Sequence, residues 1–170
     1  MRKSYNILHL ATHAVFLDRS PENSFILMGD GNRLNLQDIK NWQLPNVDLI
    51  TLSACQTALG GELGSGLEVL GFGYQLQLTG ARSSISSLWS VDDGGTQRLM
   101  KIFYSLLQQG MPKAEALQQA QVALIKGDFT ANGKLRGSFI IEATTGTAPI
   151  ETNLKHPFYW APFILIGNGL

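Results

Sequence analysis

Short apolar runs alternate along the chain with segments of helical periodicity. Four of these runs are rich in β-branched, aromatic and other apolar residues, have the short length of buried strands, and end at a polar or turn-forming step. They are residues 5–12, 47–54, 81–89 and 158–166. Pro162 within the last run predicts that this strand lies at a sheet edge or is bulged.

Two shorter runs, 25–28 and 33–36, flank residues 29–32, whose sequence is GDGN. Glycine, aspartate and asparagine favour the tight turn between two antiparallel strands. These residues therefore predict a β-hairpin. Residues 36–42 follow it as a short predicted helix, which ends before Pro45.

Longer segments with helical spacing lie between the predicted strands. Residues 67–78 place apolar side chains on one helical face, and Gly80 closes the segment. A second helix begins near Asp93 or Thr96, either of which is a suitable cap, and stops at Gly110.

A third helix opens at Pro112 and runs through Lys126. Residues 127–153 are polar and rich in glycine and threonine, and they predict a mobile loop.

Strands that alternate with helices predict one α/β domain over residues 1–170, a sandwich with a largely parallel sheet. In such sheets the functional residues gather at the carboxyl ends of the strands. His13 and Cys55 each follow the end of a predicted strand. We therefore expect these two side chains at the same edge of the sheet.

The composition excludes several classes of function. Lys plus Arg equals Asp plus Glu at 13 each, so the charge gives no general attraction to nucleic acid or anionic membranes. No run reaches the ~20 apolar residues of a membrane-spanning helix, and the first residues lack the pattern of a signal peptide. We expect a soluble cytoplasmic protein without a nucleic-acid or membrane partner.

Cys55 is the single cysteine of the chain, which excludes an internal disulfide. A thiolate is the reactive form of cysteine, and a nearby imidazolium lowers the thiol pKa from about 8.5. On this interpretation His13 is the general base and acid, and Cys55 forms a thioester with the substrate. The backbone N–H groups of Cys55 and Ala14 would hold the oxyanion. The alternative is that Cys55 is a small buried residue and His13 a hydrogen-bonded structural one.

Four segments resemble the CHAT domain: residues 9–14 (HLATHA), 47–61 (VDLITLSACQTALGG), 66–93 and 156–168. CHAT domains are caspase-like cysteine peptidase domains of clan CD, common in bacteria and often attached to tetratricopeptide repeats. The resemblance covers nearly all of the chain. It implies a caspase-like three-layer sandwich, a catalytic His13, a Cys55 nucleophile, and a protein or peptide substrate.

The chain departs from the family pattern in two ways. The family usually has glycine after the catalytic histidine, whereas this chain has Ala14, which is expected to add a methyl group beside the site. A full CHAT domain also has strands upstream of the histidine strand. We therefore expect a catalytic half without those N-terminal strands, whose partner is a tetratricopeptide-repeat protein or another CHAT-half polypeptide.

Residues 89–93 (WSVDD) resemble the equivalent segment of separases, related peptidases that cut after arginine. The resemblance implies that Asp93, or failing that Asp92, lines a pocket for a basic side chain. The alternative is that a first-turn carboxylate caps the helix that follows.

Three other patterns do not predict a functional site. His9 and His13 have the spacing of two metalloprotease ligands, but no glutamate follows His9, so no metal is expected. Residues 60–66 are glycine-rich but lack the lysine and serine or threonine of a phosphate-binding loop, so no cofactor is expected. His156 is interpreted as structural.

The sequence thus favours a cysteine endopeptidase that uses His13 and Cys55. A catalytically inactive CHAT-type interaction module, or a fragment that needs a partner chain, is the alternative. A nucleotide-binding α/β domain is a third possibility, which the glycine-rich segment alone supports.

Overall fold

The computed structural model describes residues 5–15, 17, 20–56, 67–89, 93–127 and 154–170. Contacts within the chain divide it into two compact units. The first comprises residues 1–91 and 162–170, and the second comprises residues 92–161. Each unit is described by itself.

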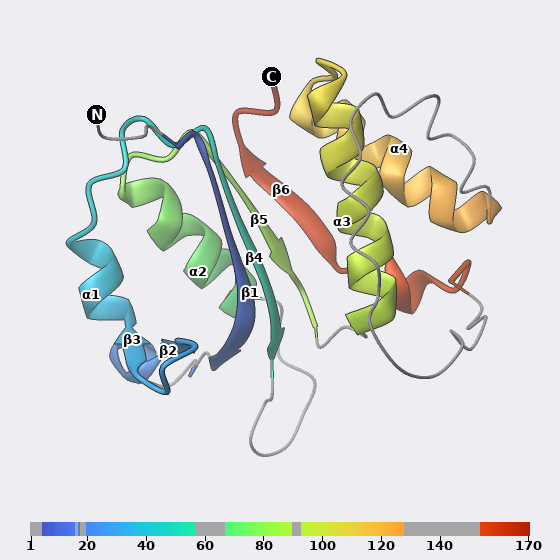
Figure 1. Ribbon diagram of the computed structural model, residues 1–170. Helices are drawn as coiled ribbons and strands as arrows, with labels where there is room; N and C mark the ends of the chain where they lie inside the picture. The colour runs from blue at the N-terminus through green and yellow to red at the C-terminus, as the bar shows by residue number, and fades with distance from the viewer. Residues whose placement is uncertain (1–4, 16, 18–19, 57–66, 90–92, 128–153) are drawn as a thin grey trace. The chain divides into compact units, whose positions relative to one another are not determined.

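The first unit is built on a six-stranded sheet with the order β3-β2-β1-β4-β5-β6 (Figure 1). The strands are β1 (Ile7–Val15), β2 (Phe25–Leu27), β3 (Arg33–Asn35), β4 (Leu49–Gln56), β5 (Ser83–Ser87) and β6 (Phe163–Gly167).

The sheet is mixed, so the expectation of a largely parallel sheet is wrong. β1 pairs with β4 and β4 with β5 in parallel, whereas β2, β3 and β6 all join their neighbours in antiparallel pairs. The cause is local. A tight turn joins β2 to β3, and β6 returns beside β5 in the opposite direction, so only the three central strands have parallel neighbours.

The predicted hairpin is confirmed, with a turn that its polar residues stabilise. The carboxylate of Asp30 accepts hydrogen bonds from the backbone N–H of Asn32 at 3.0 Å and from its side-chain amide at 2.7 Å. Both hydrogen bonds lower the pKa of Asp30 below its usual range, and the bond from the backbone N–H has the larger effect. Gly31 has a positive φ of 84°, a conformation that glycine adopts at little cost.

The predicted helix after the hairpin is α1 (Leu36–Lys40), slightly shorter than expected. Asp38 in its first turn accepts a hydrogen bond from the backbone N–H of Asn35 at 3.0 Å, which satisfies one donor at the helix start. The predicted helix over residues 67–78 is confirmed as α2 (Leu67–Leu78), and Gly80 follows it with φ of 97°.

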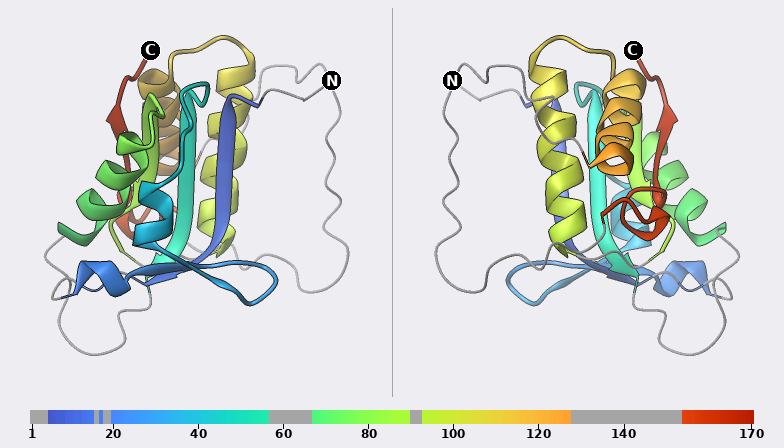
Figure 2. Two further views of the ribbon diagram at one scale, coloured as in Figure 1. Left: turned by 90° about the vertical axis from the view of Figure 1, so that its left-hand side faces the viewer. Right: turned by 90° about the vertical axis from the view of Figure 1, so that its right-hand side faces the viewer.

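One face of the sheet carries a hydrophobic core cluster of the first unit. Ser84 Oγ of β5 donates to the Gly73 carbonyl of α2 at 3.2 Å, and α1 contacts α2 on the same side, as Figures 1 and 2 show. The buried residues of this core are Ala14, Ile26, Leu36, Ile39, Val47, Ile50, Leu52, Leu76 and Ala81.

β1 is not the last strand of the sheet, because β2 pairs with its residues His13–Val15. Residues 7–12 of β1 pair with β4. Among the described residues, no strand pairs with residues 7–12 of β1 on the side away from β4. The expected absence of N-terminal strands stays a prediction.

The run 158–166, expected to be one strand, contains two elements. A 3₁₀ helix, η2 (Pro157–Tyr159), precedes β6. His156 starts this helix, because its Nδ1 accepts a hydrogen bond from the Phe158 N–H at 3.2 Å, which confirms its structural role. Pro162 lies directly before β6, which is an edge strand. This position suits a proline, because proline has no backbone N–H to donate within a sheet.

The second unit is a helical hairpin of α3 (Asp93–Gln108) and α4 (Lys113–Lys126), both close to their predicted ranges. Gly110, which has φ of 85°, follows the end of α3, and Pro112 precedes the first residue of α4. The segment around η2 packs on both helices. Gly95 gives Tyr159 the room to contact α3, and Gln121 of α4 donates to the Trp160 carbonyl at 3.1 Å.

Gly167→Ala is expected to lower the free energy of unfolding by about 1–3 kcal/mol, because Gly167 has φ of 100° and an added Cβ would lie 2.6 Å from the Arg82 carbonyl oxygen. Urea titration followed by circular dichroism measures the change. Gly29→Ala is the matched control, because nothing lies within 4 Å of a Cβ at that position. Equal stability of the two variants would contradict the expected strain.

Candidate active site

The parallel pairing of β1 with β4 brings the two predicted catalytic residues to the same level of the sheet. The Cα of His13 is the register partner of the Cα of Cys55, and the pairing continues to Ala14 and Gln56. Neighbouring strands lie about 4.8 Å apart, so the backbones at positions 13 and 55 are adjacent. Both positions are near the carboxyl ends of their strands, as active-site residues of α/β sheets are.

The two residues lie inside the strands, not just past their ends as the sequence led us to expect. β1 runs to Val15 and β4 to Gln56, each beyond its predicted last residue. β2 explains the extension of β1, because its antiparallel pairing holds residues His13–Val15 in the sheet. The hydroxyl group of Thr12 also donates a hydrogen bond to the Leu27 carbonyl of β2.

Alternate residues of a strand lie on opposite faces of the sheet. Along β1, His9, Ala11 and His13 are exposed, whereas Leu8 and Leu10 pack on the core. The registered positions on β4 for these exposed residues are 51, 53 and 55. Positions 13 and 55 therefore share the face opposite the core.

Ala14 does not place its methyl group beside the site. Its side chain is 5% exposed and belongs to the core cluster, on the face opposite His13. An alanine at this position fills the core with one additional carbon atom. The proposed role of the Ala14 and Cys55 N–H groups as oxyanion donors stays a prediction, and both residues lie in paired strands.

A second histidine lies on the face of His13. His9 Nε2 is 2.8 Å from Ser53 Oγ, a hydrogen bond between β1 and β4. Partial burial of the imidazole lowers the pKa of His9 below its ordinary value of 6.5, although the residue as a whole is exposed. The sequence analysis does not predict this role of His9, which it weighs as a metal ligand and rejects. The alternation along β1, which places residues 9 and 13 on one face, is the signal that identifies the two histidines as neighbours.

The proposed substrate-pocket residues belong to the second unit. Asp93 is the exposed first residue of α3, and Asp92 lies outside the described residues. Thr96, the other predicted cap, has a buried Oγ1 without a hydrogen-bond partner among the described residues. Its hydroxyl therefore does not cap α3. A carboxylate in the first turn is compatible with both readings of Asp93, as a helix-stabilising group and as a pocket residue.

Two further predictions fall on residues that the structure does not describe: the glycine-rich segment 60–66, and most of the loop 127–153. Within the described ranges, no three His, Cys, Asp or Glu side chains lie together in a way that would hold a metal ion. None of the described helices has the length and apolar character needed to span a membrane.

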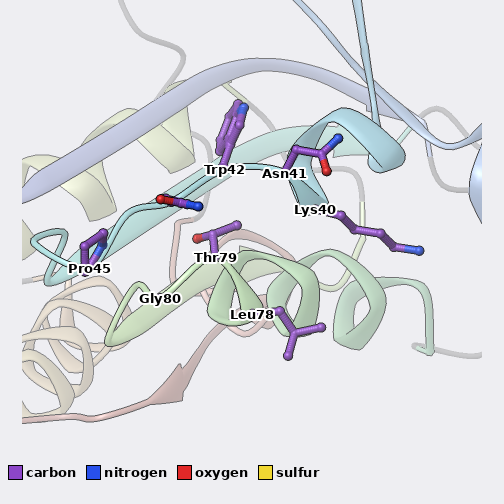
Figure 3. Close-up of a pocket in the computed structure, with 8 residues that line it drawn as sticks. Lys40, Asn41, Trp42, Pro45, Leu78, Thr79 and Gly80 are labelled. Atoms are coloured by element: carbon purple, nitrogen blue, oxygen red, sulfur yellow. The ribbon is translucent and has the colours of Figure 1, made fainter.

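A separate hollow has a volume of about 560 Å³, and Figure 3 shows the side chains that line it. It is formed by the end of α1, the segment that leads to β4, and the end of α2. Its lining residues are Lys40, Asn41, Trp42, Gln43, Pro45, Leu78, Thr79 and Gly80. The segment precedes the first residue of β4, whereas Cys55 is next to the last, so this hollow is not part of the candidate active site.

Comparison with protein families gives a match to the CHAT domain over residues 1–168. The match extends across both compact units and includes His13, Cys55 and Asp93. It confirms the resemblance found in the sequence. Comparison with curated proteins gave no match.

His9 is expected to make the fold less stable in acid. Because burial lowers its pKa in the folded protein, the unfolded chain binds this proton at higher pH. The contribution of neutral His9 to stability is therefore complete above pH ~6.5 and declines as the pH falls from there to the folded pKa.

NMR titration of the His9 ring, with urea unfolding on both sides of that pH, measures both effects. The variant His9→Gln should lose less stability on acidification than the parent. A His9 ring that titrates at or above 6.5 would show that this expectation is wrong.

Proposed function

Because the chain belongs to the CHAT domain family, which is associated with caspase-like cysteine peptidases, we propose that it is a cysteine endopeptidase. It cleaves proteins or peptides through His13 and Cys55. The observation that carries this proposal is the register of β1 and β4, which pairs these two residues on the face opposite the core.

The chemistry follows from the properties of the two side chains. His13 takes the proton of the Cys55 thiol, and the thiolate attacks the carbonyl carbon of the scissile bond. The backbone N–H groups of Cys55 and Ala14 are the proposed donors to the oxyanion. When the tetrahedral intermediate collapses, the C–N bond breaks and the imidazolium of His13 gives its proton to the leaving amine.

The acyl group is then held as a thioester on Cys55. A water molecule, whose proton His13 accepts, attacks the thioester carbon and releases the new carboxyl terminus. The Cys55 sulfur leaves as a thiolate and is reprotonated by His13. The cycle therefore needs no cofactor, and it returns both side chains to their starting state.

The exposed position of His13 supports this role. A general base must reach both the nucleophile and an incoming substrate, which a fully buried ring does not. The core cluster lies on the opposite face, so a substrate that approaches His13 displaces none of the residues of that cluster.

A second candidate function is that of an interaction module completed by a companion polypeptide, such as a tetratricopeptide-repeat protein or another CHAT-half chain. The edge of β1 favours it, because residues 7–12 have a strand partner among the described residues on the β4 side alone. Exposed backbone donors and acceptors along such an edge are suited to the addition of a strand. A strand added here would extend the sheet toward the full caspase-like sandwich.

For the substrate, we propose a basic residue immediately before the cleaved bond, bound by Asp93 or Asp92. A carboxylate in a partly enclosed pocket forms charge-assisted, bidentate hydrogen bonds with arginine. The resemblance of residues 89–93 to separases supports this assignment.

Cys55→Ala is expected to abolish peptide hydrolysis, and His13→Ala is expected to reduce kcat/KM by about 10²–10⁴-fold, the usual contribution of a general base. Both replacements leave the core cluster intact, so the circular dichroism of the variants should match that of the parent. Hydrolysis of a fluorogenic peptide measures the rates. Undiminished hydrolysis by purified Cys55→Ala would refute the catalytic pair.

Asp93→Asn is expected to weaken a preference for arginine or lysine before the cleaved bond by about ten- to a hundredfold, the value of one charged hydrogen bond. Cleavage of a peptide library by the parent, Asp93→Asn and Asp92→Asn gives the profiles. A profile that favours apolar or acidic residues, or that neither substitution alters, would remove the pocket assignment and leave the catalytic pair in place.

A further inference from the structure

We infer that His9 and Ser53 extend the catalytic pair as positioning residues, with Ser53, held by His9, stabilising the thiolate of Cys55. This inference rests on the proposed function, because it needs Cys55 as the nucleophile. It adds two residues to the site, neither of which touches the reacting carbonyl.

The first support is the way in which the hydrogen bond between His9 and Ser53 crosses the two strands. The register partner of His9 is Thr51, and that of Ser53 is Ala11. The 2.8 Å contact between His9 Nε2 and Ser53 Oγ therefore runs diagonally across the two strands, toward their carboxyl ends. His13 and Cys55 lie further along the two strands in this direction.

The spacing is the second support. Residues two positions apart in a strand are separated by about 6.5 Å and lie on the same face. Ser53 is two positions before Cys55, and Ala11 is two positions before His13. Ala11, between the two histidines on this face, has a small side chain. Ser53 is the nearest hydroxyl-bearing position of β4 to Cys55 on this face, and at this spacing its hydroxyl would act on the thiolate through one bridging water molecule.

The chemistry of the pair is the third support. A neutral imidazole carries one N–H donor and one acceptor nitrogen. Burial lowers the pKa of His9 and so favours this neutral form. When Nε2–H donates to Ser53 Oγ, the hydroxyl proton of Ser53 is available for a second acceptor. A thiolate at position 55 is such an acceptor, and hydrogen bonds to an anion favour the charged form and lower its pKa.

Few other charges lie on this face within the described residues of β1, β2, β4 and β5. The face positions of β5 are Ser83, Ile85 and Ser87, and the register partner of His13 on β2 is Leu27. Among the described residues of these strands, His9 and His13 are thus the titratable side chains that share the face with position 55.

A role confined to holding the strands together is less suited to the pair. β1 and β4 already pair continuously from Ile7 with Leu49 to Ala14 with Gln56, and the core fixes their other face. The sheet register is therefore set without a side-chain hydrogen bond on the face of His9 and His13.

The test measures the thiolate directly, because Cys55 is the single cysteine. The rate of alkylation by iodoacetamide, followed by intact mass across a pH series, gives the midpoint of thiolate formation. The parent should titrate below pH ~8.5, and His13→Ala should raise the midpoint. Ser53→Ala should raise it by about 0.5–1 unit, so that alkylation below the midpoint is about three- to tenfold slower.

Three further variants separate positioning from a general loss of structure. Ser53→Thr keeps the hydroxyl and should restore the midpoint, and His9→Gln should raise it by less than Ser53→Ala does. Ser86→Ala is the matched control, because Ser86 lies on the opposite face of β5 and its buried hydroxyl has no partner among the described residues. It should leave the midpoint unchanged.

The outcomes distinguish this inference from the proposed function. If His13→Ala raises the midpoint and Ser53→Ala does not, the role of Ser53 is refuted and the catalytic pair stands. If the parent titrates near pH ~8.5 and His13→Ala changes nothing, both fall. If circular dichroism shows that Ser53→Ala is unfolded, His9→Gln decides: a raised midpoint supports the inference and an unchanged one overturns it.

Discussion

The in-register parallel pairing of β1 with β4 is the constraint on which the candidate site depends. Because residues of both strands alternate between two faces, one register places His9, Ala11 and His13 beside Thr51, Ser53 and Cys55. A slip of one residue would move either set to the core face. The buried partners on that face, such as Leu10 and Leu52, oppose such a slip, so apolar burial on one side fixes the chemistry on the other.

The position of the pair within the sheet adds to this constraint. At His13, β1 has β2 on one side and β4 on the other, and β4 pairs with β5 as far as Leu52, three residues before Cys55. Side chains on paired interior strands are held more firmly than side chains on loops, which favours a preorganised site. The antiparallel strands β2, β3 and β6 enclose the parallel centre without altering its register.

The α/β class, the hairpin, the helices and the pair His13 and Cys55 were accessible from the sequence, since each has a local signal of periodicity, turn residues or motif. The antiparallel direction of β6 was not, because direction depends on how the chain returns and not on residues 163–167 themselves. The position of the Ala14 methyl group also required the register, because Ala14 lies two residues beyond the predicted strand end at residue 12 and so had no assigned face. The pairing of His9 with Ser53 joins residues far apart in sequence, which no local pattern encodes.

The two candidate functions need not exclude each other, because both act through β1. His13 and Ala14 pair with both β2 and β4, whereas residues 7–12 pair with β4 alone among the described strands. His9 lies in the part of β1 that pairs with β4, and His13 lies in the part that pairs with both β2 and β4. A companion strand beside residues 7–12, as proposed above, would add a second neighbour to the part of β1 that carries His9, and through the proposed role of Ser53 it would act on Cys55. Partner binding and catalysis would then be linked by one strand, with the partner's differential affinity for the ordered form as the source of the coupling.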